Sequence, residues 1–349
     1  MLISSVDEYS GKSGFIMALG SILKDRGYRV GYFKPLGIGR FIGDKLVDED
    51  ALAIAETLKI DDPIDVICPV MIDKPYIEFV ISADPVKIVR DISKAYEDIR
   101  QDKDVVLVEG ALHYELGRAL GLCDVSVASM LDIDDLMIVK FTEDSVIDRL
   151  LSAKSQFGEK LKAAIFNQVS GYKRSYLESL AKSLLAKNGL DVLGMIPKDS
   201  LLAGVFVSEI ASALGGRYLV EPEKDYIIEQ LLVGAMSPQS ALGYFRKTKN
   251  CAVITGGDRS DLIMLALEIP NVKCLILTGN LEPPSIVVGK AEEKGIPMIV
   301  VAEDTLTTVE KTQSIFRKAR IRGKEKIERM RELIEMFVNL DKLIEYIGL

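Results

Sequence analysis

The residues best suited to chemistry are Lys12 and Ser13, in the stretch SSVDEYSGKSG that spans residues 4–14. They follow an apolar run typical of a strand and precede a helical pattern, where free amide groups and the helix dipole favour phosphate oxygens. A lysine at this place neutralises phosphate charge, and a serine hydroxyl ligates Mg²⁺. A standard phosphate-binding loop, G-x-x-x-x-G-K-[ST], has its first glycine where this chain has Val6. The stretch is therefore a working nucleotide site, a degraded one or a coincidence.

Three more polar residues end predicted strands of the same region. Glu109 ends VVLVEG, Lys34 ends the strand in GYFKPLG, and Asn167 lies in AIFNQV. Open α/β sheets bind ligands at the carboxyl ends of their strands, so these side chains are candidates for one site. Glu109 fits a magnesium ligand or a capping or surface carboxylate. Asn167 fits recognition of an adenine edge or a turn-forming asparagine.

The elements that must position these residues are predicted by periodicity. Residues 1–215 alternate short apolar runs with helical patterns, which predicts a mostly parallel sheet flanked by helices. Glycine, proline and charge gather in GGRYLVEPEKD, so we expect a linker over residues 216–225. The alternation then resumes, which predicts a second, smaller α/β domain over residues 226–321. Apolar residues at helical spacing predict an amphipathic C-terminal helix within residues 322–349.

The second domain repeats one arrangement of small and polar residues after two strands. CAVITGGDRSD places two glycines and an Asp–Arg pair between a strand and a helix, and LILTGN follows one unit later. Backbone exposed at glycines beside charged groups can hold a polar ligand. The alternative is a glycine turn followed by an aspartate that caps the helix. The candidate effector-binding residues are Gly256, Gly257, Asp258, Arg259, Thr278 and Gly279.

Composition excludes several classes of function. The formal charge of −8 argues against nucleic acid or an anionic membrane as a partner. The single histidine, His113, removes most histidine-based catalysis and metal binding. Four scattered cysteines and the lack of a long apolar run or signal peptide predict a cytoplasmic protein. The basic stretch RKARIRGKEK is expected to be a solvated helix face.

Seven short segments of the first domain together resemble a known family. In order they are SSVDEYSGKS, GYFKPLG, DEDALAI, VISADP, LVEGA, FNQV and GMIP, and they look like segments of dethiobiotin synthetase and of its relative cobyrinic acid a,c-diamide synthase. The loop of that family, G-x-x-x-x-x-G-K-T, is one residue longer, so its first glycine falls at Ser5. The resemblance implies a P-loop NTPase-type fold that binds ATP and Mg²⁺.

Carried over residue by residue, the resemblance assigns roles to positions of this chain. It implies that Lys12 and Lys34 are catalytic, with Lys12 on the phosphates and Lys34 facing the transferred phosphoryl group. It implies nucleotide contacts by Gly11, Lys12, Ser13, Gly14, Asn167 and Pro197, and magnesium ligation by Ser13, Asp50 and Glu109. This chain reads EGALHYELG where dethiobiotin synthetase has a glycine run after the glutamate, so dethiobiotin synthesis is not expected. The ammonia transfer of diamide synthases is not expected either, because the chain lacks a cysteine in a nucleophile elbow.

The second domain resembles the DRTGG domain, with TGN in place of its last TGG, and the match extends to DTLTT. A synthetase-like domain before a DRTGG domain is also the arrangement at the amino end of long phosphotransacetylases, where the pair is regarded as regulatory. The chain ends where their transferase would begin, so we expect a stand-alone regulatory half without acyl transfer. The relatives are commonly dimeric or higher, which implies a homo-oligomer, and the C-terminal helix is one candidate interface.

Three hypotheses follow. In the first, the chain is an Mg·ATP-binding regulator that binds or slowly hydrolyses nucleotide, while its DRTGG domain binds a small-molecule or protein effector. In the second, it is an ATP-dependent ligase that phosphorylates a carboxylate or carbamate. In the third, the nucleotide site has decayed and the chain is an interaction module. The retained Lys12, Ser13, Asp50 and Glu109 argue against decay. The altered loop after Glu109 argues against the known ligase substrates but not against an unknown one, and we favour the first hypothesis. Whether the chain is an enzyme stays open.

Overall fold

The computed structural model describes all residues 1–349. The chain forms two compact units, of which the first contains Met1–Lys198 together with Ile321–Leu349 and the second contains Asp199–Arg320. Residues 216–225, where a linker is expected, include strand β11 (Arg217–Val220) of the second unit. The local glycine, proline and charge there belong to turns around this strand. The C-terminal residues, expected as a separate helix, are assigned to the first unit.

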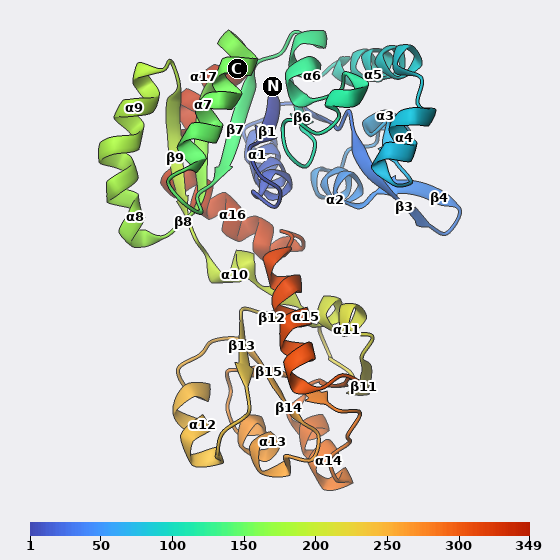
Figure 1. Ribbon diagram of the computed structural model, residues 1–349, viewed down its shortest axis with the longest axis vertical. Helices are drawn as coiled ribbons and strands as arrows, with labels where there is room; N and C mark the ends of the chain where they lie inside the picture. Colours follow the sequence, from blue (N-terminus) through green and yellow to red (C-terminus); the bar gives the residue numbers. More distant parts are fainter. The chain divides into compact units, whose positions relative to one another are not determined.

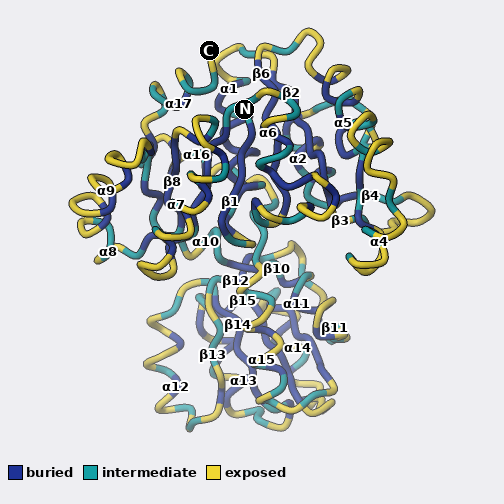
Figure 2. The backbone as a smooth tube through the Cα atoms, turned by 45° about the horizontal axis from the view of Figure 1, so that its top comes forward, coloured by how far each residue is buried: buried dark blue, intermediate teal, exposed yellow.

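The first unit is built on a six-stranded parallel sheet whose order is β2-β6-β1-β7-β8-β9 (Figure 1). Its strands are β1 (Leu2–Ser5), β2 (Val30–Phe33), β6 (Val105–Glu109), β7 (Asp135–Lys140), β8 (Leu161–Val169) and β9 (Asp191–Pro197). Each coincides with one of the apolar runs of the sequence. Continuous apolar runs are expected because a parallel sheet is covered on both faces. Figure 2 shows these central strands as buried backbone.

Helices connect and cover the strands of this sheet. Apart from 3₁₀ and π turns, they are α1 (Lys12–Asp25), α2 (Glu49–Leu58), α3 (Ile64–Ile67), α4 (Tyr76–Ser82), α5 (Pro85–Arg100), α6 (Asp124–Met130), α7 (Val146–Phe157), α8 (Gly171–Tyr176), α9 (Lys182–Lys187), α16 (Lys324–Phe337) and α17 (Leu340–Ile347). Helix α1 packs against both α2 and α16, and α16 also contacts β9. The last segment of the chain is thus a part of the first unit's core.

A small three-stranded sheet, in the order β4-β3-β5, was not predicted from the sequence. Its strands are β3 (Gly37–Ile42), β4 (Lys45–Asp48) and β5 (Met71–Ile72). Several apolar residues of this hairpin are exposed, including Phe41 and Ile42, so the burial pattern that marks a strand is weak here. The hairpin matters for the site because β4 ends at Asp48, directly before α2.

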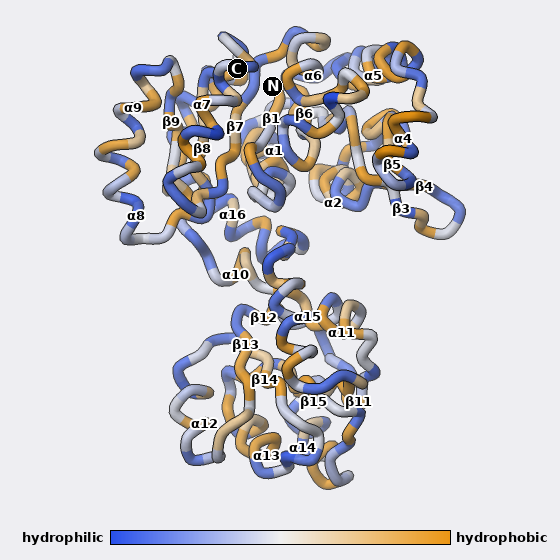
Figure 3. Tube along the Cα trace, in the orientation of Figure 1, coloured by the Kyte–Doolittle hydropathy of each residue, from blue (hydrophilic) through white to orange (hydrophobic).

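The second unit has a five-stranded sheet in the order β11-β16-β15-β14-β13. Strands β13 (Gln230–Val233), β14 (Cys251–Gly256), β15 (Val272–Thr278) and β16 (Met298–Val300) are parallel, and β11 is antiparallel to β16. Figure 3 shows hydrophobic residues along β14 and β15. The remaining elements are α10 (Ser200–Ala203), β10 (Val205–Phe206), α11 (Val207–Leu214), β12 (Ile227–Ile228), α12 (Pro238–Phe245), α13 (Ser260–Leu267), α14 (Ser285–Lys294) and α15 (Thr305–Arg317).

The predicted architecture is confirmed: a mostly parallel sheet flanked by helices, a smaller α/β domain, and helical structure at the C-terminus. The only difference at the C-terminus is that the expected helix is divided into α16 and α17. None of the helices has both the length and the apolar composition that a membrane span requires.

Candidate nucleotide site

The candidate site is built around the loop between β1 and α1. Strand β1 lies in the sheet between β6 and β7, and the loop after Ser5 leads to Gly11, the residue before α1. Gly11 has φ +93°, in the left-handed region, and α1 has no side-chain cap at its amino end. The first amide groups of α1 are therefore without a side-chain acceptor, and the positive end of the helix dipole lies at this loop. This is an arrangement that favours an anion.

Lys12 is buried in this loop and bonded to neutral oxygens. Its Nζ donates to the Ser5 Oγ at 2.5 Å and to the Leu112 carbonyl at 3.0 Å. Burial lowers the pKa of Lys12, against the opposing effect of the Asp124 and Glu109 carboxyls nearby. A buried ammonium without a directly bonded carboxylate gains most from an added anionic ligand.

Ser13 lies at the end of a buried chain of polar contacts centred on Glu109. The Ser13 Oγ donates to Glu109 Oε1 at 2.6 Å, and the Tyr32 hydroxyl donates to Glu109 Oε2 at 2.5 Å. The Lys34 Nζ lies 3.6 Å from Glu109 Oε2 and 2.9 Å from Asp48 Oδ1. Burial by itself would lower the pKa of Lys34, but Glu109 and Asp48 raise it above its ordinary value, so the lysine stays charged. The structure thus brings Ser13, Lys34 and Glu109 together.

Asp48 is a member of this cluster that the sequence analysis missed. Its side chain caps α2 by accepting from the amides of Asp50 (3.0 Å) and Ala51 (2.8 Å), and it also accepts from the Ile38 amide at 2.8 Å. Burial opposes ionisation, but Lys34 and these amides lower the pKa of Asp48. An aspartate directly before a helical pattern is a capping signal, so local sequence could have identified its first role but not its pairing with Lys34.

A second residue missed from the sequence is Asp124, the first residue of α6. Its Oδ1 accepts from the Ala111 amide at 2.9 Å, and its own amide donates to the Tyr114 carbonyl at 3.0 Å. Asp124 therefore holds the loop after Glu109, which carries the Leu112 carbonyl bonded to Lys12. Its Oδ2 is buried without a hydrogen-bond partner, and burial raises the pKa of Asp124 to about 7. No local pattern marks this role, because the contact spans two separate elements.

Asp50, a predicted magnesium ligand, adjoins the Glu109 cluster: its amide donates to Asp48 Oδ1, and its carboxyl contributes to raising the pKa of Lys34. Its Oδ1 accepts from the Arg322 guanidinium at 3.1 Å, and the same guanidinium lies 3.2 Å from Glu49 Oε2. No group of three or more His, Cys, Asp or Glu side chains is arranged to hold a metal by itself. Mg²⁺ commonly uses one or two carboxylates and completes its shell with phosphate and water, and the adjoining Ser13 and Glu109 oxygens fit such a site.

Asn167, at the end of β8, lies against the loop. Its Nδ2 donates to the Ser10 carbonyl at 2.7 Å, and its Oδ1 accepts from the Gln168 amide at 2.9 Å. A Cβ added to Gly11 would lie 2.5 Å from this Nδ2, so a side chain there would displace Asn167. Pro197 ends β9 and pairs in register with Val169, at the same edge of the sheet. The carboxamide of Asn167 is thus engaged within the protein, and its adenine contact stays a prediction.

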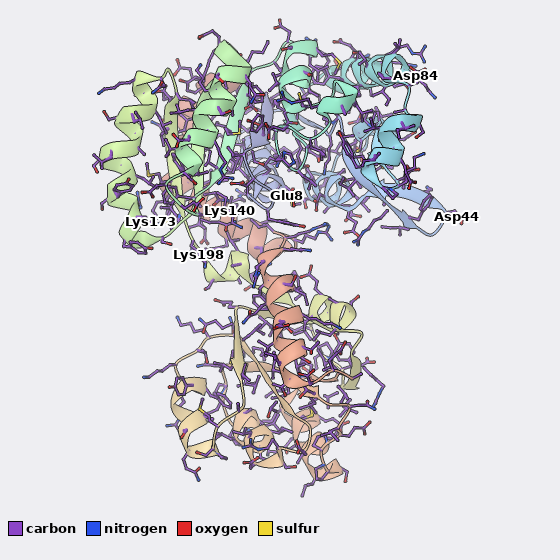
Figure 4. All side chains as sticks on the ribbon, in the orientation of Figure 1. Glu8, Asp44, Asp84, Lys140, Lys173 and Lys198 are labelled. Atoms are coloured by element: carbon purple, nitrogen blue, oxygen red, sulfur yellow. The ribbon has the colours of Figure 1, made fainter.

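Three of the residues labelled in Figure 4 follow or end strands of the first sheet: Glu8, Lys140 and Lys198. Glu8 belongs to the loop after β1, Lys140 is the last residue of β7, and Lys198 follows β9. Lys140 pairs in register with Asn167, and the Lys198 amide donates to the Val169 carbonyl at 3.0 Å. Charged side chains therefore follow the strands on the edge where the loop lies, as expected for the ligand-binding edge of an α/β sheet.

In the second unit, the predicted residues lie at the carboxyl ends of β14 and β15. A Cβ on Gly257 would lie 1.8 Å from the Leu281 carbonyl oxygen, so close backbone approach accounts for this glycine. The Arg259 guanidinium pairs with Asp261 and donates to the Met236 carbonyl at 3.2 Å. The buried Thr278 shares a hydroxyl hydrogen bond of 2.8 Å with Thr305. Of the remaining predicted residues, Gly256 ends β14, Asp258 precedes α13, and Gly279 follows β15 with φ +79°.

Comparisons with known proteins give the following matches. Residues 1–205 match the family model of an AAA domain, and residues 209–315 match that of the DRTGG domain. The phosphate acetyltransferase of Nitratidesulfovibrio vulgaris is 22% identical over 370 residues, which cover 98% of this chain and 51% of that protein. The ATP-dependent dethiobiotin synthetase of Caldicellulosiruptor saccharolyticus is 32% identical over 111 residues, which cover 31% of this chain and 46% of that protein.

Among the solved structures that the chain matches is the septum site-determining protein MinD complexed with Mg-ADP from Pyrococcus horikoshii OT3. It has a TM-score of 0.35 and 14% identity, with 58% of this chain and 82% of that chain covered. The sequence matches confirm the resemblances to dethiobiotin synthetase, to the DRTGG domain and to phosphotransacetylases. The chain spans about half the length of the phosphate acetyltransferase that it matches.

Proposed function

This chain belongs to the AAA domain family, here joined to a DRTGG domain, and from that premise we propose that its first unit binds ATP together with Mg²⁺ as a regulatory nucleotide sensor. The observation that carries this proposal is the state of Lys12, a buried lysine at the amino end of α1 whose bonds go to neutral oxygens. The phosphates of a nucleotide would provide the anionic partner that the direct hydrogen bonds of this ammonium lack.

The proposed roles follow from the geometry of the loop. The phosphates would lie at the amino end of α1, where Lys12 and the helix amides donate to their oxygens. Ser13 and Glu109 would hold Mg²⁺, which would neutralise phosphate charge when bound. Lys34, which lies between Asp48 and Glu109, would hold the Glu109 carboxylate in place. The second unit is proposed to bind an effector, a small molecule or a protein, at the carboxyl ends of β14 and β15.

The ligase hypothesis is the alternative, and the contacts of Lys34 favour the sensor over it. A phosphorylating enzyme of the dethiobiotin synthetase type would use Lys34 on the transferred phosphoryl group. In this protein the Lys34 Nζ is buried between Asp48 and Glu109, at 2.9 and 3.6 Å. Moving it to a phosphate would leave two buried carboxylates without their cation, which is costly. We therefore expect slow turnover, or none, that does not depend on small carboxylic acids.

Thermal unfolding tests the nucleotide site directly. ATP with Mg²⁺ should raise the melting temperature of the full chain, because a ligand at 100 times its Kd stabilises the folded state by about 2.7 kcal/mol. Lys12→Ala should abolish this shift, whereas Lys290→Ala, in helix α14 of the second unit, should keep it. A wild-type chain that binds no nucleotide at millimolar concentration refutes the proposal. Rapid turnover that requires one particular carboxylic acid would favour the ligase.

A further inference from the structure

Residues Ile321 and Arg322, called the strap below, are the first residues of the first unit after the chain returns from the second. They join Arg320, the last residue of the second unit, to α16. Both belong to the first unit, and their contacts within it lie beside the candidate nucleotide site. The strap is therefore the covalent connection by which the end of the second unit is attached to this region.

Ile321 covers the first turn of α1. A Cβ added to Gly14 would lie 2.4 Å from Ile321 Cδ1 and 2.6 Å from its Cβ, so the isoleucine occupies the space that a side chain at residue 14 would need. Gly14 directly follows Lys12 and Ser13. The position of this turn, which carries the proposed phosphate and magnesium groups, is thus set partly by packing against the strap.

Arg322 holds the start of α2. Its guanidinium donates to Glu49 Oε2 at 3.2 Å and to Asp50 Oδ1 at 3.1 Å. These carboxylates lie in the first turn of the helix that Asp48 caps, and Asp48 is the partner of Lys34. The side chain of Arg322 is 30% exposed, so its two ion pairs are only partly screened by water.

We propose that Ile321 and Arg322 are positioning residues of the nucleotide site, and that through them the site responds to the state of the second unit. The strap contacts the first turns of both helices that begin at the site, and it is bonded directly to the end of the second unit. A displacement of the chain end at Arg320 would therefore act on the α1 turn through Ile321 and on the α2 turn through Arg322. The part of the proposal that concerns nucleotide rests on the function proposed above.

Hydrogen exchange without nucleotide tests the positioning role by itself. In the full chain, Ile321→Ala should speed exchange of the hydrogen-bonded amides near the start of α1, and Arg322→Gln should do so near the start of α2. Arg322→Lys should restore part of the protection. Arg40→Gln is the matched control, because Arg40 pairs with the same Glu49 at 3.1 Å but does not belong to the strap. Exchange that is unchanged in both strap variants, or equally increased by Arg40→Gln, overturns the positioning role.

Magnesium titration adds a readout that a purely structural role would not move. Arg322→Gln removes a cation beside Asp50. The Mg²⁺ concentration at which ATP binding reaches half of its maximum should therefore fall by about two- to fivefold. The affinity for ATP without Mg²⁺ should stay within twofold of wild type. An equal loss of both affinities would overturn a specific action at the α2 turn.

Communication with the second unit is tested by lengthening the connection. In the wild type, Mg·ATP should change amide exchange in α15, and inserting Gly-Ser-Gly between Arg320 and Ile321 should remove that change while ATP still binds. A wild type that binds ATP without any change in α15 overturns the communication, and so does a change that survives the insertion. A wild type that binds no nucleotide refutes the proposed function instead, and the exchange of the nucleotide-free variants still decides the positioning role.

Discussion

The hydroxyl of Ser13 and the carboxylate of Glu109 share a hydrogen bond of 2.6 Å although 96 residues separate them in the chain. One begins the helix after the first strand of the sheet, and the other ends the neighbouring strand β6, which pairs with β1 in parallel. The bond places a hydroxyl and a carboxylate oxygen side by side at the carboxyl edge of the sheet. Around this hydrogen bond, Tyr32, Lys34 and Asp48 complete a buried cluster in which the Lys34 ammonium lies beside the carboxyl groups of Asp48 and Glu109.

Removing the charge of Glu109 should destabilise the first unit. In Glu109→Gln, Lys34 loses one of its two carboxylate partners in a site where Glu109 is 2% exposed. Breaking a buried ion pair on one side costs about 3 kcal/mol, and chemical denaturation should report a loss of about this size in the free energy of unfolding. Asp104→Asn, which removes an exposed partner of Arg29, is the control and should have little effect. A Glu109→Gln protein as stable as wild type would show that the cluster does not need the charge.

Asp124 should make stability fall with rising pH. Its pKa is raised to about 7 in the folded protein by burial, against an ordinary value near 3.8 in the unfolded chain. Between these values the folded state binds more protons than the unfolded state, so this carboxyl lowers the free energy of unfolding as pH rises from about 4 to about 7. Asp124→Asn should therefore gain stability relative to wild type across that range, as measured by urea denaturation at several pH values. Parallel pH curves for the two proteins would contradict the assignment.

Adding one methyl group to Gly14 should disturb the first turn of α1. The new Cβ of Gly14→Ala would lie 2.4 Å from Ile321, and overpacking of this kind costs about 1–3 kcal/mol. Gly289→Ala is the matched helical control, because no atom lies within 4 Å of its added Cβ. That substitution should instead stabilise helix α14, by about 0.5–1 kcal/mol. Denaturation of the two variants that gives the same sign of change would contradict this prediction.

Asn167 should support the loop for any nucleotide. Since its carboxamide bonds the Ser10 carbonyl and the Gln168 amide, Asn167→Ala should weaken ATP and GTP binding by similar factors, about tenfold for a lost side-chain contact. Isothermal titration with both nucleotides measures this ratio. A loss of affinity confined to ATP would mean that the Asn167 carboxamide leaves its protein partners and hydrogen-bonds the adenine edge, as the resemblance to dethiobiotin synthetase implies.

Local sequence was sufficient for much of the fold. The six strands of the first sheet were predicted because a parallel strand covered on both faces is a continuous apolar run. The same reasoning identified β13, β14, β15 and β16, but it missed the β3–β4 hairpin, whose exposed apolar side chains do not follow the usual burial pattern. It also expected a linker where β11 forms, since one short strand between turns carries little signal of its own.

The features of the candidate site are also of two kinds, those that local sequence predicts and those that tertiary contacts decide. From the sequence alone one could determine that Lys12 and Ser13 begin a helix after a strand, and that Glu109 ends another, because capping and periodicity act within a few residues. Only the tertiary structure decided that Asp48 is the residue that pairs with Lys34, and that Asp50 pairs with Arg322, 272 residues away in the chain. Such pairings depend on which elements pack together, and no local pattern encodes that contact.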